Sequence, residues 1–243
     1  MLISTTARRD ATRLGRISRR AFLAGAVGTL AGCATGPAAS IISAQIPAPP
    51  DPVLAAMYAA LPDERFPVPA VDVRLIDPRF LRQQVAYATS ERPGTIIVDP
   101  GARFLYLVQE DGLALRYGVG VGREGFGWNG SAIIQRKAQW PTWTPPQSMI
   151  ERDPSLAQYA GGMAPGLDNP LGARALYLYQ GGVDTLYRLH GTNEPLSIGQ
   201  AMSSGCIRMF NQDAIDLHAR TPVGTKVVVL AGGFEPATRV FPG

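Results

Sequence analysis

The feature that most constrains the fold is a series of short apolar segments between Thr95 and Leu230, separated by glycine turns. The segments are rich in β-branched and aromatic side chains, a pattern that predicts β-strands. Asp-Gly at 111–112 and Gly-Gly at 181–182 predict two hairpin turns. The strands are expected at residues 95–98, 104–108, 113–117, 132–139, 175–179, 185–190 and 226–230.

Composition supports a mainly β fold. The chain of 243 residues contains 27 glycines and 21 prolines without a collagen-like period, which excludes a helical bundle. The hydrophobic content of 46% is enough to bury the core of one domain and excludes a disordered chain. We therefore expect a compact, mainly β domain with few helices.

Two short helices are predicted before the β segments. Asp51-Pro52 precedes an Ala-rich run over 53–60, and Asp77-Pro78 precedes a second run over 79–87. An aspartate N-cap followed by proline in the first turn is typical of a helix start. Together these helices would form a small preface to the β domain.

A third helix is predicted late in the domain, with Asn211 as the N-cap of residues 212–219. The whole chain then divides into five segments. In order, these are an export signal (1–32), a linker (33–50), the helical preface (51–92), the main domain (93–232) and a C-terminal tail (233–243).

The first segment has the features of an export signal, with an apolar run too short to span a bilayer. Ser18-Arg19-Arg20-Ala21-Phe22-Leu23 resembles a twin-arginine motif, and an ordinary secretory signal is the alternative. Leu30-Ala31-Gly32-Cys33 resembles a lipobox, which makes Cys33 a lipidation candidate; cleavage near Ala38-Ala39 is the alternative. Either way we expect export to the periplasm or cell envelope, with membrane attachment only through that lipid.

The positive charge is confined to this signal. The chain carries +4 in total, whereas the six arginines and one aspartate of residues 1–32 carry +5, which leaves −1 for the rest. The remaining basic residues are spread singly, so no nucleic-acid partner is expected.

The sequence also argues against two common cofactor sites. Gly120-Val121-Gly122-Arg123-Glu124-Gly125 has the letters of a dinucleotide-binding loop, but residues 126–130 cannot start the helix that holds a pyrophosphate. His190, His218 and Cys206 do not have the spacing of a zinc site, so we expect no metal and no cofactor. His218 lies in a predicted helix, where a packing or surface role is expected.

The remaining chemistry lies in two motifs. His190 ends a predicted strand, and Cys206 follows a Gly/Ser-rich loop sixteen residues later. A thiol and an imidazole that meet in space form the pair required for nucleophilic acyl transfer. The small residues before Cys206 leave backbone N–H groups open to a developing oxyanion. On spacing alone, an inert buried cysteine beside a core histidine is an equal alternative.

With these motifs the sequence resembles the L,D-transpeptidase family with the YkuD-type catalytic domain, from about Gly94 to Leu230. The resemblance extends well beyond the histidine and cysteine motifs. It is also carried by Ile97-Val98-Asp99, Leu105-Tyr106-Leu107, Tyr117-Gly118-Val119-Gly120-Val121-Gly122-Arg123, Trp143-Thr144-Pro145-Pro146 and Asn169-Pro170-Leu171-Gly172-Ala173-Arg174-Ala175.

The resemblance implies that the mainly β domain is sandwich or barrel-like. It also implies an enzyme of peptidoglycan biosynthesis that acts in cell wall organisation and cell shape. In that family a cysteine attacks a tetrapeptide stem before its terminal D-Ala, releases D-Ala and forms a thioester. A stem amine then gives a 3-3 crosslink, and a lipoprotein-type amine gives attachment of protein to the wall. The alternatives are a carboxypeptidase or endopeptidase that uses water, and an inactive wall-binding lipoprotein.

The resemblance also implies roles for individual residues. Cys206 would be the nucleophile, His190 the base, and Gly191 the residue whose carbonyl orients the imidazole. The N–H groups of Gly205 and Cys206 would bind the oxyanion. Arg208 is a candidate for binding a substrate carboxylate or for holding the loop.

Further substrate contacts are expected beside the cysteine. Ser203 and Ser204 precede the Gly-Cys pair, and Ser204 stands where many family members have histidine, so a second imidazole is missing. Residues 140–168 are expected to form a loop that binds the acyl donor. The apolar contacts there would come from Trp143, Met163 and Tyr187, although such side chains are also common in β cores.

Overall fold

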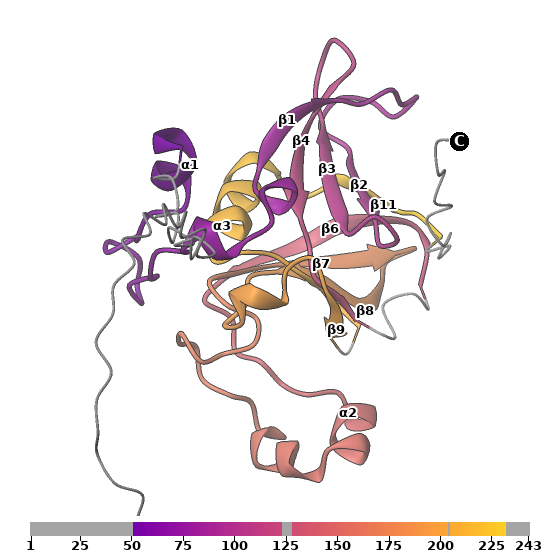
Figure 1. The fold of residues 1–243 in the computed structure, drawn as a ribbon. Helices are drawn as coiled ribbons and strands as arrows, with labels where there is room; N and C mark the ends of the chain where they lie inside the picture. The colour runs from indigo at the N-terminus through magenta and orange to yellow at the C-terminus, as the bar shows by residue number, and fades with distance from the viewer. Residues whose placement is uncertain (1–50, 123–127, 204, 232–243) are drawn as a thin grey trace, which may run out of the picture. The chain divides into compact units, whose positions relative to one another are not determined.

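The computed structural model describes residues 51–122, 128–203 and 205–231 (Figure 1). The predicted export signal with Cys33, the linker, Ser204 and the C-terminal tail lie outside the described residues, as does the side chain of Ser203. No helix within the described ranges is long and apolar enough to cross a membrane.

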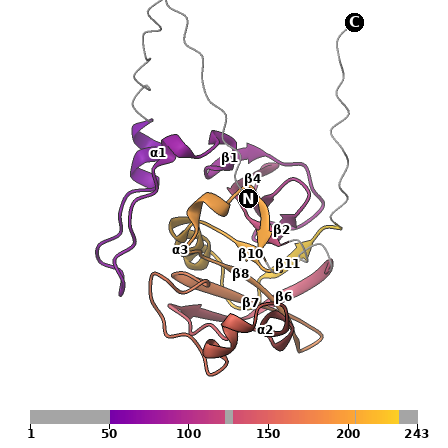
Figure 2. The same cartoon turned by 60° about the horizontal axis from the view of Figure 1, so that its bottom comes forward.

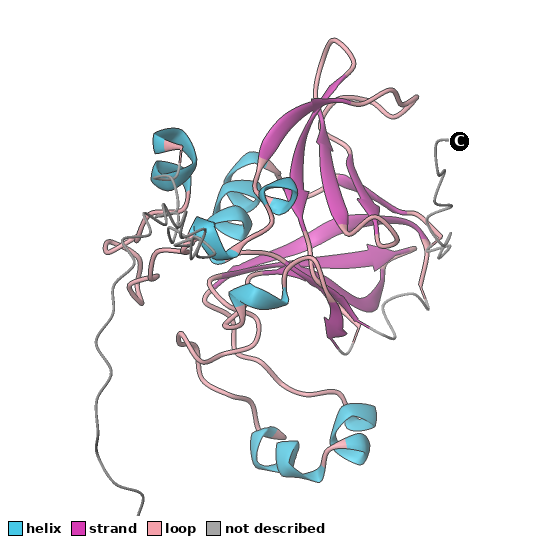
Figure 3. Ribbon diagram, in the orientation of Figure 1, coloured by secondary structure: helices cyan, strands magenta, loops and turns pink. Residues whose placement is uncertain are grey.

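The expected mainly β architecture is confirmed. Among the described residues, nine strands form one mixed sheet in the order β1-β4-β3-β2-β11-β6-β7-β8-β10, and β5 and β9 pair separately (Figure 3). The strands are β1 (Gln83–Ala86), β2 (Ile96–Asp99), β3 (Phe104–Val108), β4 (Leu113–Gly118), β5 (Val121–Gly122), β6 (Gly130–Gln139), β7 (Arg174–Gln180), β8 (Val183–His190), β9 (Ala201–Ser203), β10 (Ile207–Arg208) and β11 (Lys226–Val229).

All the strands predicted from the sequence are present, with ends that shift by one or two residues. The two hairpin turns are also confirmed. Asp111 and Gly112 both have positive φ, 57° and 69°, and Gly181 and Gly182 have φ of 58° and 83°. Asp-Gly and Gly-Gly pairs favour such turns because both residues tolerate positive φ. These turns are common in hairpins because the twist of the turn matches the right-handed twist of the flanking strands.

The sheet curls so that β10, at one end, meets the segment that follows β4. Gly120, which follows β4, donates its N–H to the Arg208 carbonyl at 2.9 Å and accepts the Arg208 N–H at 2.8 Å. A side chain at Gly120 would overlap the Ser197 carbonyl, so only glycine permits this approach. Gly120, the first glycine of the motif that resembles a dinucleotide-binding loop, therefore allows the curled sheet to close.

The curled sheet encloses the main core. Side chains from both halves of the sheet and from α3 (Asn211–Arg220) pack together there. The fully buried members include Ile96, Val98, Leu105, Tyr117, Ile134, Leu176, Leu178, Leu189, Ile207, Met209 and Leu217. This core fixes the positions of β8 and β10, which carry the candidate site.

The first predicted helix is confirmed as α1 (Pro52–Met57), where the Asp51 carboxylate accepts the Val53 N–H at 2.7 Å. The second prediction is wrong. The Asp77 cap is followed by one 3₁₀ turn, η2 (Pro78–Phe80), and β1 then pairs with β4. The preface is therefore only partly helical, because edge pairing supplies the hydrogen bonds that a longer helix would have made.

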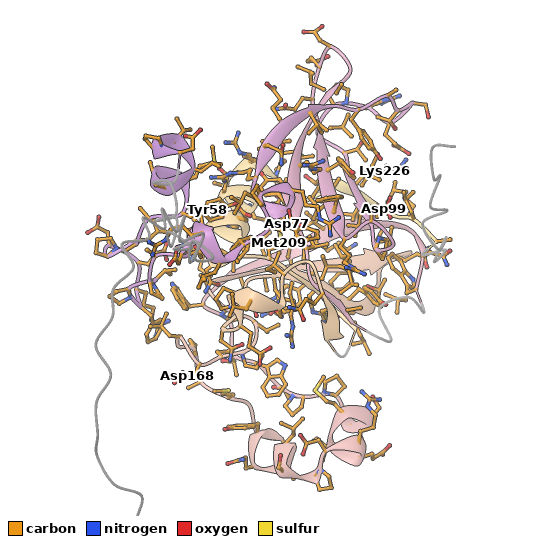
Figure 4. The ribbon with its side chains drawn as sticks, viewed as in Figure 1. Tyr58, Asp77, Asp99, Asp168, Met209 and Lys226 are labelled. Carbon is orange, nitrogen blue, oxygen red and sulfur yellow. The ribbon has the colours of Figure 1, made fainter. Side chains whose placement is uncertain are left out.

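A buried polar cluster joins the preface to α3, and Figure 4 shows Tyr58 close to that helix. The Tyr58 hydroxyl donates to Asp213 at 3.0 Å and accepts the Arg82 N–H at 2.7 Å. Arg82 lies 2.7 Å from Asp216 but 3.7 Å from Asp213. Burial raises the pKa of the fully buried Asp213 to about 7, although Arg82 acts in the opposite direction.

This cluster predicts a pH dependence of stability. Because the pKa of Asp213 is higher in the folded chain than in the unfolded one, the folded state binds the proton more tightly, and its stability falls as pH rises through about 7. Urea unfolding should show that Asp213→Asn flattens this decline between the ordinary carboxyl pKa of 3.8 and the raised value of about 7. Parallel profiles for the variant and the parent would contradict the assignment.

Candidate active site

The site lies where β8 and β10 run side by side (Figure 2). The strands are parallel, with Leu189 opposite Ile207 and His190 opposite Arg208. Leu189 and Ile207 are fully buried in the core. Since side chains alternate between the two faces of a strand, His190 and Arg208 point to the opposite face.

The same alternation places Cys206 on the face that carries His190. Cys206 directly precedes β10, so it lies across from Arg188 and diagonally from His190. Diagonal neighbours on adjacent strands are about 7–8 Å apart at the backbone, so these two residues are near neighbours on that face. The structure thus brings the predicted nucleophile and base to one face of two adjacent strands.

His190 is held as a neutral base. It is only 4% exposed, and its Nδ1 lies 2.6 Å from the Gly191 carbonyl oxygen. A carbonyl only accepts hydrogen bonds, so Nδ1 carries the proton of the neutral ring and Nε2 carries the lone pair. Burial lowers the pKa of His190 to about 4, and the charges of Arg208 and Arg188 act in the same direction. Hydrogen bonds of the ring to the backbones of Gly191 and Pro170 oppose this shift. The imidazole is therefore neutral at pH 7 and able to accept a proton.

The thiol is also neutral at rest. Burial raises the pKa of Cys206, while a hydrogen bond from the Arg188 backbone and the positive charges of Arg188 and Arg208 oppose that rise. The Cys206 Sγ lies 3.7 Å from the Leu186 carbonyl oxygen, to which it donates. For a neutral thiol that shares a face with a neutral imidazole, acyl transfer requires the base to take the proton as the sulfur attacks.

Asn211 is a site residue that the sequence reasoning missed. It was predicted as a helix N-cap, but Phe210 holds that position and Asn211 is the first residue of α3. Its Oδ1 accepts the Ala173 N–H at 2.9 Å, and its Nδ2 donates to the Thr192 carbonyl at 2.9 Å. The side chain thus ties the start of β7 to the segment after His190. Asparagine is common at N-caps, which hid this role.

Asn211 also explains why Gly191 is a glycine. A Cβ at Gly191 or at Gly172 would overlap the Asn211 Oδ1 atom. The Gly191 N–H donates to the Arg174 carbonyl at 3.0 Å, so both backbone groups of this residue are engaged. The predicted orienting role of Gly191 therefore fits the observed contact to His190.

Arg208 holds the loop beside the site. Its guanidinium donates to the Glu194 carboxylate at 2.6 Å, with the arginine side chain 17% exposed and the glutamate 60% exposed. Of the two roles predicted for Arg208, the loop contact is present, and binding of a substrate carboxylate stays a prediction. Gly205 has a φ of 139°, a conformation that favours glycine. Its role as an oxyanion donor, together with Cys206, also stays a prediction.

The predicted donor loop is a long insertion between β6 and β7, which Figure 1 shows extending away from the sheet. It contains α2 (Gln147–Arg152) and η4 (Pro154–Tyr159). Trp143 and Met163 pair through backbone hydrogen bonds of 3.1 and 2.7 Å, so two of the predicted contacts lie together. Trp140, by contrast, is buried below the insertion and donates its indole N–H to Glu64.

The insertion is fastened at its root by Asn169, which is fully buried. The Asn169 amide donates to the carbonyls of Pro141 and Ala164, at 3.1 and 3.0 Å. Tyr187 lies elsewhere, since its ring packs against the main core and against Trp128 at 5.3 Å. The structure therefore does not bring Tyr187 together with the other two apolar candidates.

The second histidine of the chain is His218. His218 lies in the last turn of α3, where burial lowers its pKa to about 4; the charges of Lys137 and Arg174 act in the same direction and Glu64 opposes them. Within the part of the chain that the structure describes, no group of three His, Cys, Asp or Glu side chains is placed to hold a metal ion.

The contact around Gly191 predicts the effect of one methyl group. Gly191→Ala forces its Cβ against Asn211, and overpacking of this kind costs about 1–3 kcal/mol of unfolding free energy. Because the His190 contact is displaced, acylation of Cys206 should also slow. Urea unfolding and the rate of acyl-enzyme formation measure the two effects. Gly166→Ala, where a Cβ meets open space, is the control for stability; equal unfolding free energies for the two variants would refute this packing.

The chain is similar in sequence to known proteins. Residues 93–229 match the YkuD family model, described as the L,D-transpeptidase catalytic domain. Two probable L,D-transpeptidases of Escherichia coli K12 are similar: YbiS is 32% identical over 148 residues, covering 60% of this chain and 47% of YbiS. ErfK/SrfK is 31% identical over 154 residues, covering 61% and 47%. The chain thus spans about half the length of these curated relatives.

Solved structures are also similar. A crystal structure from Brucella melitensis, described as a probable carnitine operon oxidoreductase, is 49% identical, covers 65% of this chain and 99% of that one, and has a TM-score of 0.46. An L,D-transpeptidase from Mycobacterium smegmatis is 19% identical, covers 56% and 58%, and has a TM-score of 0.41. The match to the family model covers more than half of the residues, and the chain belongs to the L,D-transpeptidase family with the YkuD catalytic domain.

Proposed function

We propose that this chain is a peptidoglycan L,D-transpeptidase that uses Cys206 as its nucleophile. The observation that carries the proposal is a neutral, buried His190 on the same face as Cys206, with its Nδ1 proton held by the Gly191 carbonyl. This arrangement leaves the Nε2 lone pair to accept the thiol proton. The relatives are described as probable L,D-transpeptidases, which agrees with this chemistry.

In the proposed first half-reaction, the Cys206 sulfur attacks the carbonyl that precedes the terminal D-Ala of a tetrapeptide stem. His190 takes the thiol proton as the carbon–sulfur bond forms, and the N–H groups of Gly205 and Cys206 bind the oxyanion. When the tetrahedral intermediate collapses, the carbon–nitrogen bond breaks and His190 returns the proton to the D-Ala amine. The products are free D-Ala and a thioester on Cys206.

In the second half-reaction, an amine attacks the thioester carbonyl and His190 removes a proton from that amine as the carbon–nitrogen bond forms. The carbon–sulfur bond then breaks, and His190 returns the proton to the Cys206 sulfur, which regenerates the free thiol. A stem amine gives a 3-3 crosslink, and an amine of a wall-attached lipoprotein gives protein attachment. Trp143 and Met163, paired within the insertion, would contact the acyl donor together with Ser203 and Ser204. We also propose export to the periplasm, with a lipid on Cys33 as the membrane anchor.

The proposed reaction predicts which products depend on the two residues. Incubation with tetrapeptide muropeptides and an amine acceptor should give dimers or exchanged D-amino acid, detected by mass spectrometry. Cys206→Ala should give neither product nor acyl-enzyme, and His190→Ala should lower acylation by about 10²–10⁴-fold, the usual contribution of a general base. Tripeptide as the sole cysteine-dependent product would show that water is the acceptor.

Two results would count against the proposal. An acyl-enzyme in the His190→Ala variant at the parental rate would remove the histidine from its assigned role. Absence of any product and of any acyl-enzyme in the folded parent would leave a wall-binding protein, and circular dichroism of each variant would verify folding.

The lowered pKa of His190 predicts where the acylation rate falls on the acidic side of its pH profile, the acid limb. The base is active when it is neutral, so the acylation rate should fall as pH drops through about 4. An exposed histidine would instead produce this limb near pH 6.5. The measurement is kcat/KM for acylation against pH, with circular dichroism at each pH to exclude unfolding. A limb near the ordinary histidine value would contradict the buried, neutral imidazole.

A further inference from the structure

Strand β8 is irregular directly beside the thiol. Asp184 pairs with Tyr179 and Arg188 pairs with Tyr177, so three residues of β8 lie opposite one residue of β7. At the centre of this bulge Leu186 has a φ of 62°, a left-handed conformation that is costly for leucine. Its side chain is 66% exposed, so burial does not offset that cost. Other contacts must hold the bulge.

The bulge presents two backbone groups to the nucleophile. The Leu186 carbonyl oxygen lies 3.7 Å from the Cys206 Sγ. The Arg188 backbone also forms a hydrogen bond to this thiol, which stabilises its ionised form. The segment from Leu186 to Arg188 therefore sets the surroundings of the sulfur.

One ion pair spans the bulge. The Arg188 guanidinium donates to both carboxylate oxygens of Asp184, at 2.6 and 2.8 Å. Asp184 Oδ1 also accepts the Leu186 N–H at 2.8 Å, and Arg188 donates to the Tyr187 carbonyl at 2.9 Å. The guanidinium is further fixed 4.4 Å above the ring centre of Tyr177. Together these contacts tie the start, centre and end of the bulge to one another.

We propose that the Asp184–Arg188 ion pair is a clamp that sets the position and the reactivity of Cys206 by holding the bulged segment against the thiol. Both are positioning residues, since they act through the backbone of Leu186 and Arg188 and through the charge of the guanidinium. A fork of two hydrogen bonds suits this task because it fixes orientation as well as distance. The consequence for turnover rests on the proposed function, whereas the consequence for the thiol does not.

The test measures the thiol itself. Asp184→Asn, Arg188→Lys and the double variant are made in the full chain with Cys33→Ser, which leaves Cys206 as the only cysteine. The rate of alkylation by iodoacetamide is followed against pH. Each single variant should react about tenfold more slowly at neutral pH, equivalent to a rise of about one unit in the apparent pKa of Cys206. In Asp184→Asn this rise opposes a direct effect of charge, because the Asp184 carboxylate itself raises the pKa of Cys206; displacement of the Arg188 backbone from the thiol is expected to outweigh it. Because the two residues act through one ion pair, the variant with both substitutions should react little more slowly with iodoacetamide than either single variant.

A matched control separates the clamp from loss of an ion pair in general. Arg74 makes a similar two-bonded contact to Asp72, at 2.8 and 2.7 Å, on an exposed turn of the preface. Arg74→Lys should leave alkylation unchanged. Thermal unfolding of every variant is recorded alongside. If the ion pair were merely structural, its loss would lower the melting temperature and leave the pH profile of alkylation as in the parent. That outcome would overturn the proposal.

A rescue variant keeps the test decisive if Arg188→Lys folds poorly. Leu186→Gly adopts positive φ without strain, so adding it to Asp184→Asn should restore part of the alkylation rate. If the variant that combines Leu186→Gly with Asp184→Asn is folded and its alkylation rate does not recover, the clamp proposal is overturned. Slower alkylation in the clamp variants, together with a parent that forms no product from muropeptides, would support the clamp and refute the proposed function.

Discussion

The parallel pairing of β10 with β8 is the contact on which the candidate site depends. It is very short, with Ile207 and Arg208 opposite Leu189 and His190, yet it decides which side chains share a face. Two buried contacts stabilise it: Leu189 and Ile207 pack in the core, and Gly120 hydrogen-bonds Arg208 from the other side. Closure of the curled sheet and assembly of the site are therefore the same structural event.

Burial gives this site its electrostatic character. It lowers the pKa of His190 and raises that of Cys206, so both groups are neutral at pH 7. Such a pair differs from a thiolate–imidazolium ion pair, because charge develops only as the sulfur attacks. The Gly191 carbonyl stands where a triad carboxylate would otherwise orient the ring, and a carbonyl does so without placing a full negative charge near the thiol.

Much of the fold followed from local patterns, because strands such as β3 and β6 are long enough to show β-branched side chains and are bounded by turns. The strands that complete the site were missed: β5 and β10 have two residues each, too few for any periodicity. Asn211 carried an ambiguous signal, since the same side chain suits an N-cap. The bulge at Leu186 gave no signal, because leucine has no preference for positive φ.

The central claim is that His190 is a neutral base whose proton resides on Nδ1. Nitrogen-15 NMR of the imidazole measures both properties directly, in a chain carrying His218→Gln so that His190 is the only histidine. We expect a neutral ring at pH 7, protonated at Nδ1, that becomes charged only near pH 4. A doubly protonated ring at pH 7, or a neutral ring protonated at Nε2, would contradict it.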